Sequence, residues 1–244
     1  MTETRTRLRA QLWIVLGLSL GQSAVYSVVQ LLDKATRAPL AEGTSTLNPV
    51  RSSREVFDLI YQLLDIGFAL VPVALVLYLL WQPGKSAFTV LGFTADKPVR
   101  DVLWGIGLML AMGLPSLGLY AAGRAMGVTT EIITSALDAH WWTIPVLVLS
   151  AIRHALVEEI IVVGYLLNRL EKLGWAPWVA VLASSLLRGS YHLYQGLGPF
   201  LGNFLMGLVF CWVYKRWGRL APLVIAHALL DIAAFTAGPL LGFG

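Results

Sequence analysis

Long apolar stretches constrain this chain more than any other feature. A bilayer is crossed by a helix of about 20 predominantly apolar residues, and the 244-residue sequence holds seven stretches of that kind. Of all residues, 57% are apolar and 13% charged, a balance that excludes a soluble domain of this size. The sequence predicts an all-α, polytopic transmembrane helical bundle in a lipid bilayer. Its seven spans are approximately 10–32, 57–81, 101–126, 142–168, 175–195, 198–217 and 219–240.

The seven stretches fall into two groups. The last four are joined by very short loops, and short loops force consecutive helices to lie side by side as an antiparallel bundle. We therefore divide the chain into residues 1–141, with three helices and their loops, and residues 142–244, a compact helical bundle. The first stretch continues to Leu32, longer than the apolar part of a signal peptide, and is taken as a spanning helix.

Lysine and arginine predict the orientation of the chain. With the N-terminus inside, eleven of them fall on the cytoplasmic side and five on the other, which favours an N-inside, C-outside topology. Of the five cations on the other side, which count against this topology, four lie in the first loop. The cations form no dense patch with interleaved aromatic residues, so we predict no nucleic-acid partner. The five outer cations are Lys34, Arg37, Arg51, Arg54 and Arg124.

Ionisable side chains interrupt three of the apolar stretches. Each would cost roughly 2.5–3.5 kcal/mol if charged and unpaired at the centre of a membrane helix. They must therefore face one another or water, which predicts that the three helices meet at one polar pocket. The spacing agrees, because three pairs lie four residues apart and so share a helix face. The residues are Arg153, His154, Glu158, Glu159, Arg188, His192, His227 and Asp231.

A buried ion-pair network that only fixes helix packing is the structural alternative. Two histidines among the acids weaken it, because the histidine side chain titrates nearest to neutral pH. Outside the core of the cluster, Arg153 and His154 are expected to tune or satisfy the glutamates. Asp65 is expected to make a helix-packing hydrogen bond, and His140 is given no chemical role.

Three motifs within these stretches carry a resemblance. They are Glu158-Glu159 in VEEIIVVGYLLNRL, His192 in SSLLRGSYHLYQG, and His227 with Asp231 in APLVIAHALLD. In order and spacing they resemble the CAAX protease and bacteriocin-processing family of intramembrane proteases, which includes the type II CAAX prenyl endopeptidases. The resemblance covers roughly residues 142–240.

The resemblance implies an intramembrane endopeptidase that cleaves a peptide, a membrane protein or a lipidated substrate, in a bacterial cell membrane. It implies that Glu158 with His192 activates water and that His227 with Asp231 stabilises the oxyanion, while Glu159 supports the architecture. Two positions depart from the family pattern: Val163 stands where the first motif has arginine, and Arg188 where the second has phenylalanine.

Other functions remain open at this point. One glutamate and two histidines match the ligand set of a catalytic zinc ion, but no HExxH signature is present, so we predict no cofactor, with zinc as the alternative. A proton-coupled transporter also uses acids and histidines, although the chain lacks an inverted repeat. A non-proteolytic membrane scaffold is favoured by the loss of arginine at position 163.

Three geometric predictions follow. Glu158, His192 and His227 lie close enough to share one water or one metal. Their pocket is reached from within the membrane or from its cytoplasmic half. Arg188 replaces the missing cation by binding Glu159 bidentately, which leaves Glu158 free to act on water.

Overall fold

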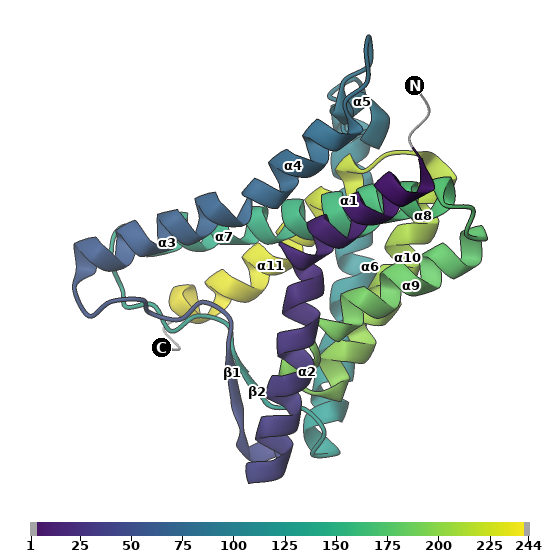
Figure 1. The fold of residues 1–244 in the computed structure, drawn as a ribbon. Helices are drawn as coiled ribbons and strands as arrows, with labels where there is room; N and C mark the ends of the chain where they lie inside the picture. Colours follow the sequence, from purple (N-terminus) through teal and green to yellow (C-terminus); the bar gives the residue numbers. More distant parts are fainter. Residues whose placement is uncertain (1–3, 242–244) are drawn as a thin grey trace.

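The computed structural model describes residues 4–241, with side chains up to residue 237, as a helical assembly (Figure 1). The prediction of an all-α membrane bundle is confirmed; the sheet is confined to two short strands. The helices are α1 (Arg5–Gly17), α2 (Leu20–Arg37), α3 (Glu55–Ala69), α4 (Val71–Leu80), α5 (Ala87–Leu91), α6 (Pro98–Ala125), α7 (Thr143–Glu158), α8 (Leu166–Lys172), α9 (Pro177–Ser190), α10 (Leu197–Trp217) and α11 (Ala221–Leu241). Strands β1 (Thr44–Thr46) and β2 (Glu131–Ile133), 3-10 turns η1 (Leu40–Glu42) and η3 (Leu193–Gln195), and the π-helix η2 (Glu159–Tyr165) complete the chain.

Fewer helices than the seven predicted are long and apolar enough to cross a membrane. Among the described residues, three meet that standard: Glu55–Leu80, Pro98–Ala125 and Leu197–Trp217. A fourth exists if α1 and α2, which are bent by 51°, act as one broken span. The predicted span 175–195 contains a helix of only 14 residues, α9. Within Glu55–Leu80, the helix is interrupted between α3 and α4. Pro72, at the start of α4, explains this break because it lacks the N–H that a continuous helix would need.

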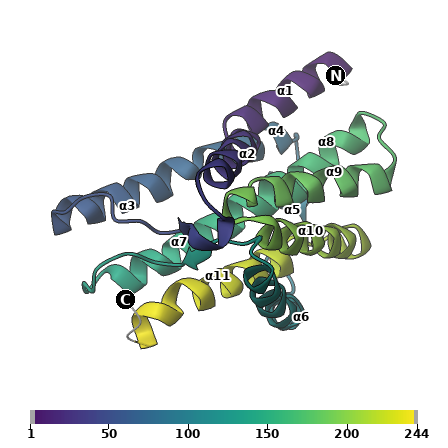
Figure 2. The same cartoon turned by 90° about the horizontal axis from the view of Figure 1, so that it is seen from below.

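A continuous rod made of α7, η2 and α8 passes between the other helices (Figure 2). All seven residues of η2 are buried. A π-helix is rare and found mostly at functional sites. Here the wider turn leaves the Val162 carbonyl able to accept a hydrogen bond from the Ser184 hydroxyl of α9 at 2.7 Å. The π-helix begins at Glu159, the second residue of the glutamate pair.

Two glycines let α9, α10 and the loop between them approach their neighbours. Gly207 of α10 packs against α9, where an added Cβ would lie 2.9 Å from the Ser185 Cα. Gly196, the residue before α10, has φ of 105°, and a Cβ there would lie 2.5 Å from the Val128 carbonyl oxygen. The loop 191–196 is thus held against the segment that follows α6.

Three loops meet at one end of the molecule, where Figure 1 shows β1 and β2 side by side. The strands pair in parallel, with Ser45 opposite Ile132. The Lys34 ammonium donates to the carbonyl oxygens of Thr44 and Tyr194, both at 2.9 Å. Arg124 donates to the carbonyls of Ala41 and Thr129. Loops 38–54, 126–142 and 191–196 therefore form one connected layer.

An arginine in the connection between α10 and α11 binds two acids near the start of α6. Arg219 binds Asp101 with two nitrogens, at 2.8 and 2.5 Å, and Asp96 with a third at 2.9 Å. Its hydrogen bond to Asp101 raises the pKa of Arg219. Hydrogen bonds from Thr94 and then Arg219 lower the pKa of Asp96 to about 2. The start of α6 is thereby tied to the start of α11.

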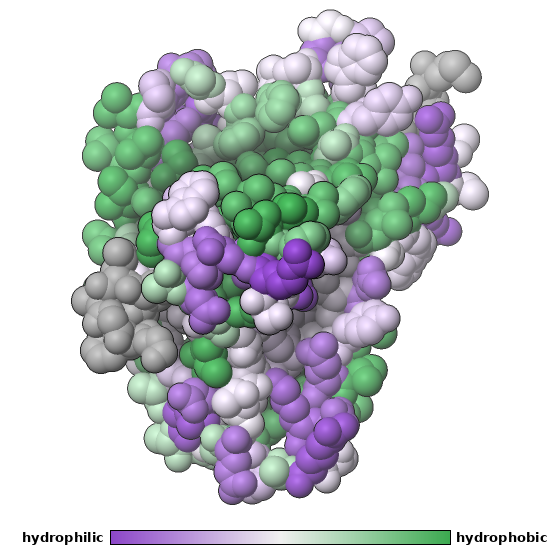
Figure 3. Space-filling view, turned by 90° about the vertical axis from the view of Figure 1, so that its left-hand side faces the viewer, coloured by the Kyte–Doolittle hydropathy of each residue, from purple (hydrophilic) through white to green (hydrophobic). Residues whose placement is uncertain are grey.

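Large apolar side chains cover much of the outer surface. Figure 3 shows a broad hydrophobic area on the upper half of one face, with hydrophilic residues in the middle and at the lower end. Such an extent of exposed apolar surface is typical of lipid contact. Together with the long apolar helices, it identifies an integral membrane protein. Examples on α2 and α3 are Val25, Val29, Leu32, Phe57, Ile60, Leu64 and Phe68.

Candidate active site

The two predicted glutamates lie at the junction of α7 and η2, where the rod is most deeply buried. Glu158 is 5% exposed and Glu159 is fully buried. Buried carboxylates are costly unless they are paired and hydrogen-bonded. Two helices supply the partners: α9 with the turn that follows it on one side, and α11 on the other.

Arg188 of α9 is the cation of this cluster. Its Nη2 lies 2.6 Å from Glu159 Oε1 and 3.4 Å from Glu158 Oε2. The arginine is fully buried, and its guanidinium also stacks over the Phe210 ring at 5.2 Å. The predicted partner of Glu159 is therefore the right one, but the bidentate geometry is wrong. One nitrogen, Nη2, approaches both glutamates. Nε and Nη1 are buried and have no hydrogen-bond partner among the described residues.

His227 of α11 joins the glutamates to Asp231. Its Nδ1 lies 2.7 Å from Glu159 Oε1, and its Nε2 lies 4.0 Å from Glu158 Oε2 and 3.6 Å from Asp231 Oδ2. An ionised carboxylate only accepts hydrogen bonds, so the contact with Glu159 places a proton on Nδ1. The 3.0 Å approach of Arg188 Nη2 to the same Nδ1 is then a contact between two donors that share Glu159.

His192 reaches the cluster because α9 ends early. We expected it to sit one turn beyond Arg188 on the same helix, but α9 stops at Ser190 and His192 lies in the turn that follows. Its Nε2 is 3.9 Å from Glu158 Oε1. On the other side of the ring, the Gln195 side-chain amide lies 3.3 Å from Nδ1. With that amide as donor, the ring proton sits on Nε2 and faces Glu158.

Glu158, His192 and His227 are thus brought together, as the spacing predicted. Arg188 and Asp231 join them. The structure also adds Tyr191 and Gln195, which the sequence reasoning missed. The Tyr191 hydroxyl donates to Glu158 Oε2 at 2.8 Å. Their proximity in sequence to His192 was the only signal for them, because their side chains reach the site through a turn rather than a helix face.

The polar residues around this cluster agree with expectation only in part. His154 Nδ1 lies 3.8 Å from Asp231 Oδ2, and the ring also interacts electrostatically with Glu158. The Arg153 side chain donates to Ser150. Asp65 forms an ion pair with Arg51 at 2.8 Å rather than a helix-packing hydrogen bond. His140 lies 3.5 Å from Glu55, outside the cluster.

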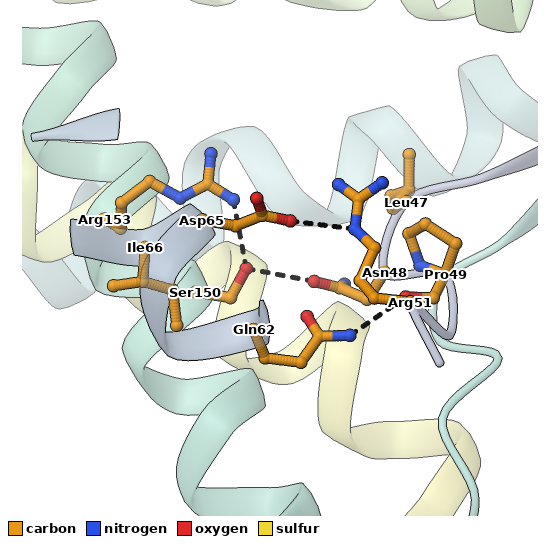
Figure 4. Close-up of a pocket in the computed structure, with 9 residues that line it drawn as sticks. All are labelled: Leu47, Asn48, Pro49, Arg51, Gln62, Asp65, Ile66, Ser150 and Arg153. Carbon is orange, nitrogen blue, oxygen red and sulfur yellow. Dashed lines mark hydrogen bonds and ion pairs between the residues drawn. The ribbon is translucent and has the colours of Figure 1, made fainter. Parts of the chain in front are cut away.

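Two cavities adjoin the site. One of about 450 Å³ is lined by Tyr191 together with residues of α2 and the segment 44–51. Another of about 230 Å³ lies between that segment, α3 and α7 (Figure 4). Both are bounded by a loop that the charge count assigns to the outer side. Access from within the membrane or from the cytoplasmic half stays a prediction, and the cavities show that loop 38–54 folds back against α7 and Tyr191.

The histidines and acids of the cluster are also the side chains that a zinc ion would need as ligands. Among the described side chains, no three His, Cys, Asp or Glu residues are arranged to hold a metal ion. His227 directs one ring nitrogen to Glu159 and the other lies 4.0 Å from Glu158. The residues as placed do not fit the zinc alternative, and the prediction that no cofactor is needed remains to be tested in solution.

Comparison with known proteins finds a family that is similar to the segment carrying this cluster. Residues 140–233 match the family described as type II CAAX prenyl endopeptidase Rce1-like. Searches among curated proteins and among solved structures gave no match. The matched segment is less than half of the chain, yet it contains every residue of the cluster. The resemblance read from the three motifs is therefore confirmed: residues 140–233 are similar to the Rce1-like family of CAAX-type intramembrane endopeptidases.

Proposed function

We propose that this protein is an intramembrane endopeptidase in which Glu158 acts as the base that activates water. The observation that carries the proposal is the pair of imidazoles on either side of one buried carboxylate. His192 Nε2 and His227 Nε2 lie 3.9 and 4.0 Å from the two Glu158 oxygens. These distances exceed a hydrogen bond, and they suit groups that contact a shared water or substrate atom.

Glu158 is held in place for this role without being fully neutralised. Tyr191 and Arg188 both approach Oε2, at 2.8 and 3.4 Å. Oε1 faces His192 instead. A base must lie within hydrogen-bond reach of the proton that it removes. We assign the water to the Oε1 side, where the Nε2–H of His192 orients it.

His227 is proposed to stabilise the oxyanion. Glu159 accepts from its Nδ1, so a second proton on Nε2 gives an imidazolium that donates toward the reacting carbonyl. Asp231, at 3.6 Å from Nε2, favours this charged form. Arg188 is a positioning residue here, since it binds Glu159 and approaches Glu158 Oε2 rather than the Oε1 atom assigned to the water.

The reaction balances with these groups alone. Glu158 takes a proton from water as the water oxygen bonds to the peptide carbonyl carbon, and His227 stabilises the resulting oxyanion. The carbon–nitrogen bond then breaks, and the proton held by Glu158 passes to the departing amine. The products are a carboxylic acid and an amine, with the enzyme unchanged.

The test is cleavage of a peptide library by the purified protein in detergent, with products identified by mass spectrometry. We expect Glu158→Gln to lower kcat by at least about a hundredfold, in line with the loss of a general base. Asp33→Asn, an exposed acid on α2 that pairs with Arg37, is the matched control and should retain activity. Equal cleavage by wild type and Glu158→Gln would overturn the role of Glu158 as the base, and cleavage by neither would favour the scaffold or transporter alternative.

Metal dependence is tested in the same assay. Activity retained in EDTA supports the metal-free mechanism. Activity lost in EDTA and restored by zinc would overturn it in favour of a zinc-dependent protease. The substrate class proposed is a peptide or membrane protein, and the lipidated or prenylated alternative is tested by adding a prenyl group to cleaved peptides.

A further inference from the structure

The smaller cavity beside the site is lined by two arginines and one acid. Figure 4 shows Arg153 on one side, Arg51 on the other and Asp65 between them. The volume, about 230 Å³, suits one small group rather than a whole peptide. The remaining lining residues are Leu47, Asn48, Pro49, Gln62, Ile66 and Ser150.

Arg153 is fixed in this cavity by hydroxyl and amide groups instead of an acid. Its Nη2 donates to Ser150 Oγ at 3.3 Å, and Ser150 in turn donates to Asn48 Oδ1 at 2.9 Å. Its Nε is buried and has no partner among the described residues. A buried N–H of a charged group without an acceptor is costly, and Arg153 lines the cavity without a hydrogen bond to a carboxylate among the described residues.

The nearby acids do not neutralise both arginines. Asp65 is engaged by Arg51 Nε at 2.8 Å. Asp58 accepts from the backbone N–H groups of Arg51 and Ser52, at 2.6 and 3.2 Å, and so is already occupied. Arg153 also interacts electrostatically with Glu158, Asp231 and Asp65, but it has no hydrogen bond to a carboxylate among the described residues. The residues that line the cavity include two guanidinium groups and one carboxylate.

The cavity lies next to the proposed chemistry. Arg153 precedes Glu158 by five residues on α7, which is about 7.5 Å along a helix axis. Arg51, with Leu47 and Pro49, also lines the larger cavity that contains Tyr191. Tyr191 holds Glu158. A peptide whose scissile bond lies at Glu158 can therefore extend a neighbouring group toward Arg153.

We propose that this cavity is a substrate subsite that binds a carboxylate, with Arg153 and Arg51 as its charged partners. Arginine is suited to this task because its planar fork matches a carboxylate. The carboxylate belongs to the peptide C-terminus or to an acidic side chain near the scissile bond. The inference rests on the proposed peptidase function for its substrate, and its test is designed to be independent of cleavage.

Binding of short fluorescent peptides to the Glu158→Gln protein in detergent tests the subsite. Each library peptide is made as a C-terminal acid, as a C-terminal amide, and as an amide with an internal Gln replaced by Glu. We expect at least one acidic form to bind about tenfold or more tightly than its neutral counterpart, because hydrogen bonds to charged groups are worth about 1.5–3 kcal/mol. A preference for the first form identifies the C-terminus, and a preference for the third identifies a side chain.

Substitutions assign the effect to the cavity. Arg153→Gln should remove the preference for the acidic form while leaving binding of the neutral peptide unchanged, and Arg153→Lys should keep part of it. Arg54→Gln is the control, since Arg54 is an exposed arginine at the start of α3 that stacks over Phe57. It should retain the full preference.

The outcomes separate this inference from the proposed function. Preference for acidic peptides by Glu158→Gln, combined with no cleavage by wild type, keeps the subsite and removes the peptidase. Equal affinity for acidic and neutral peptides, or no binding of either, overturns the subsite, even where wild type cleaves peptides. An acid preference that survives Arg153→Gln in a folded protein also overturns it.

Discussion

Arg188 is the residue on which the charge balance of the site depends. It is fully buried, and one of its nitrogens contacts Glu159, His227 and Glu158. Val163, which stands at the position of the family's arginine, is fully buried in η2 and supplies no charge. The cation that contacts both glutamates therefore comes from α9 and not from the glutamates' own helix.

We expect Arg188→Phe to lower kcat/KM by at least about a hundredfold, because the glutamates and His227 would lose the group that positions them, and to lower stability by about 3–5 kcal/mol. Adding Val163→Arg should restore part of the activity by returning a cation to the glutamates. Peptide cleavage and melting temperature are measured on both variants. Arg37→Phe, at an exposed arginine, is the control. A folded double variant with no recovered activity would show that the two positions do not compensate.

At the scale of elements, the loop between α9 and α10 decides how the site is assembled. It carries Tyr191, His192 and Gln195 and ends at Gly196, whose φ of 105° and ψ of −177° are open to glycine almost alone. Thr130 N–H donates to the Gln195 carbonyl at 3.0 Å, which ties the loop to the segment after α6. His192 is therefore positioned by a turn and its neighbours.

Gly196→Ala should lower stability by about 1–3 kcal/mol through backbone strain alone, and more through contact with the Val128 carbonyl oxygen. Activity should fall with it, because the loop would shift His192. Thermal unfolding and peptide cleavage are measured together. Gly118→Ala on α6, where an added Cβ meets nothing within 4 Å, is the control and should be neutral or stabilising. An unchanged melting temperature in Gly196→Ala would contradict the strain argument.

At the scale of the whole molecule, the structure gives hydrogen-bond or ion-pair partners to three of the five cations that counted against the predicted orientation. Lys34 binds two backbone carbonyls, Arg51 pairs with Asp65 and Arg124 binds two further carbonyls. These side chains have structural partners in the layer of loops. Their presence on the outer side is then compatible with an N-inside topology.

Single-cysteine labelling in a Cys211→Ser background tests that topology. Cys211 is buried, so its replacement leaves the surface unchanged. We expect Ser53→Cys, in the first loop, to react with an impermeant reagent in intact cells, and Lys85→Cys to react only after the membrane is opened. The reverse pattern would show that the N-terminus lies outside, and the cavities beside the site would then open to the cytoplasm.

The sequence by itself determined the helical class and selected the residues that are proposed to carry the chemistry. Both follow from properties of single segments: a stretch of about 20 apolar residues is membrane-compatible whatever surrounds it, and a charge within it needs a partner. Glu158, His192 and His227 could be selected on that basis before any contact was known. Their spacing along the chain also predicted that they meet.

Tertiary structure alone decided how these residues are used. The early end of α9 puts His192 in a turn with Tyr191 and Gln195, and the folded-back loop 38–54 bounds both cavities. Arg188 contacts Glu159 through one nitrogen and not through two. Its guanidinium orientation is set by packing against the Phe210 ring and against His227 of α11. Where helices end, how they turn about their axes and which loops cover them depend on contacts between distant segments, which periodicity within one segment does not encode.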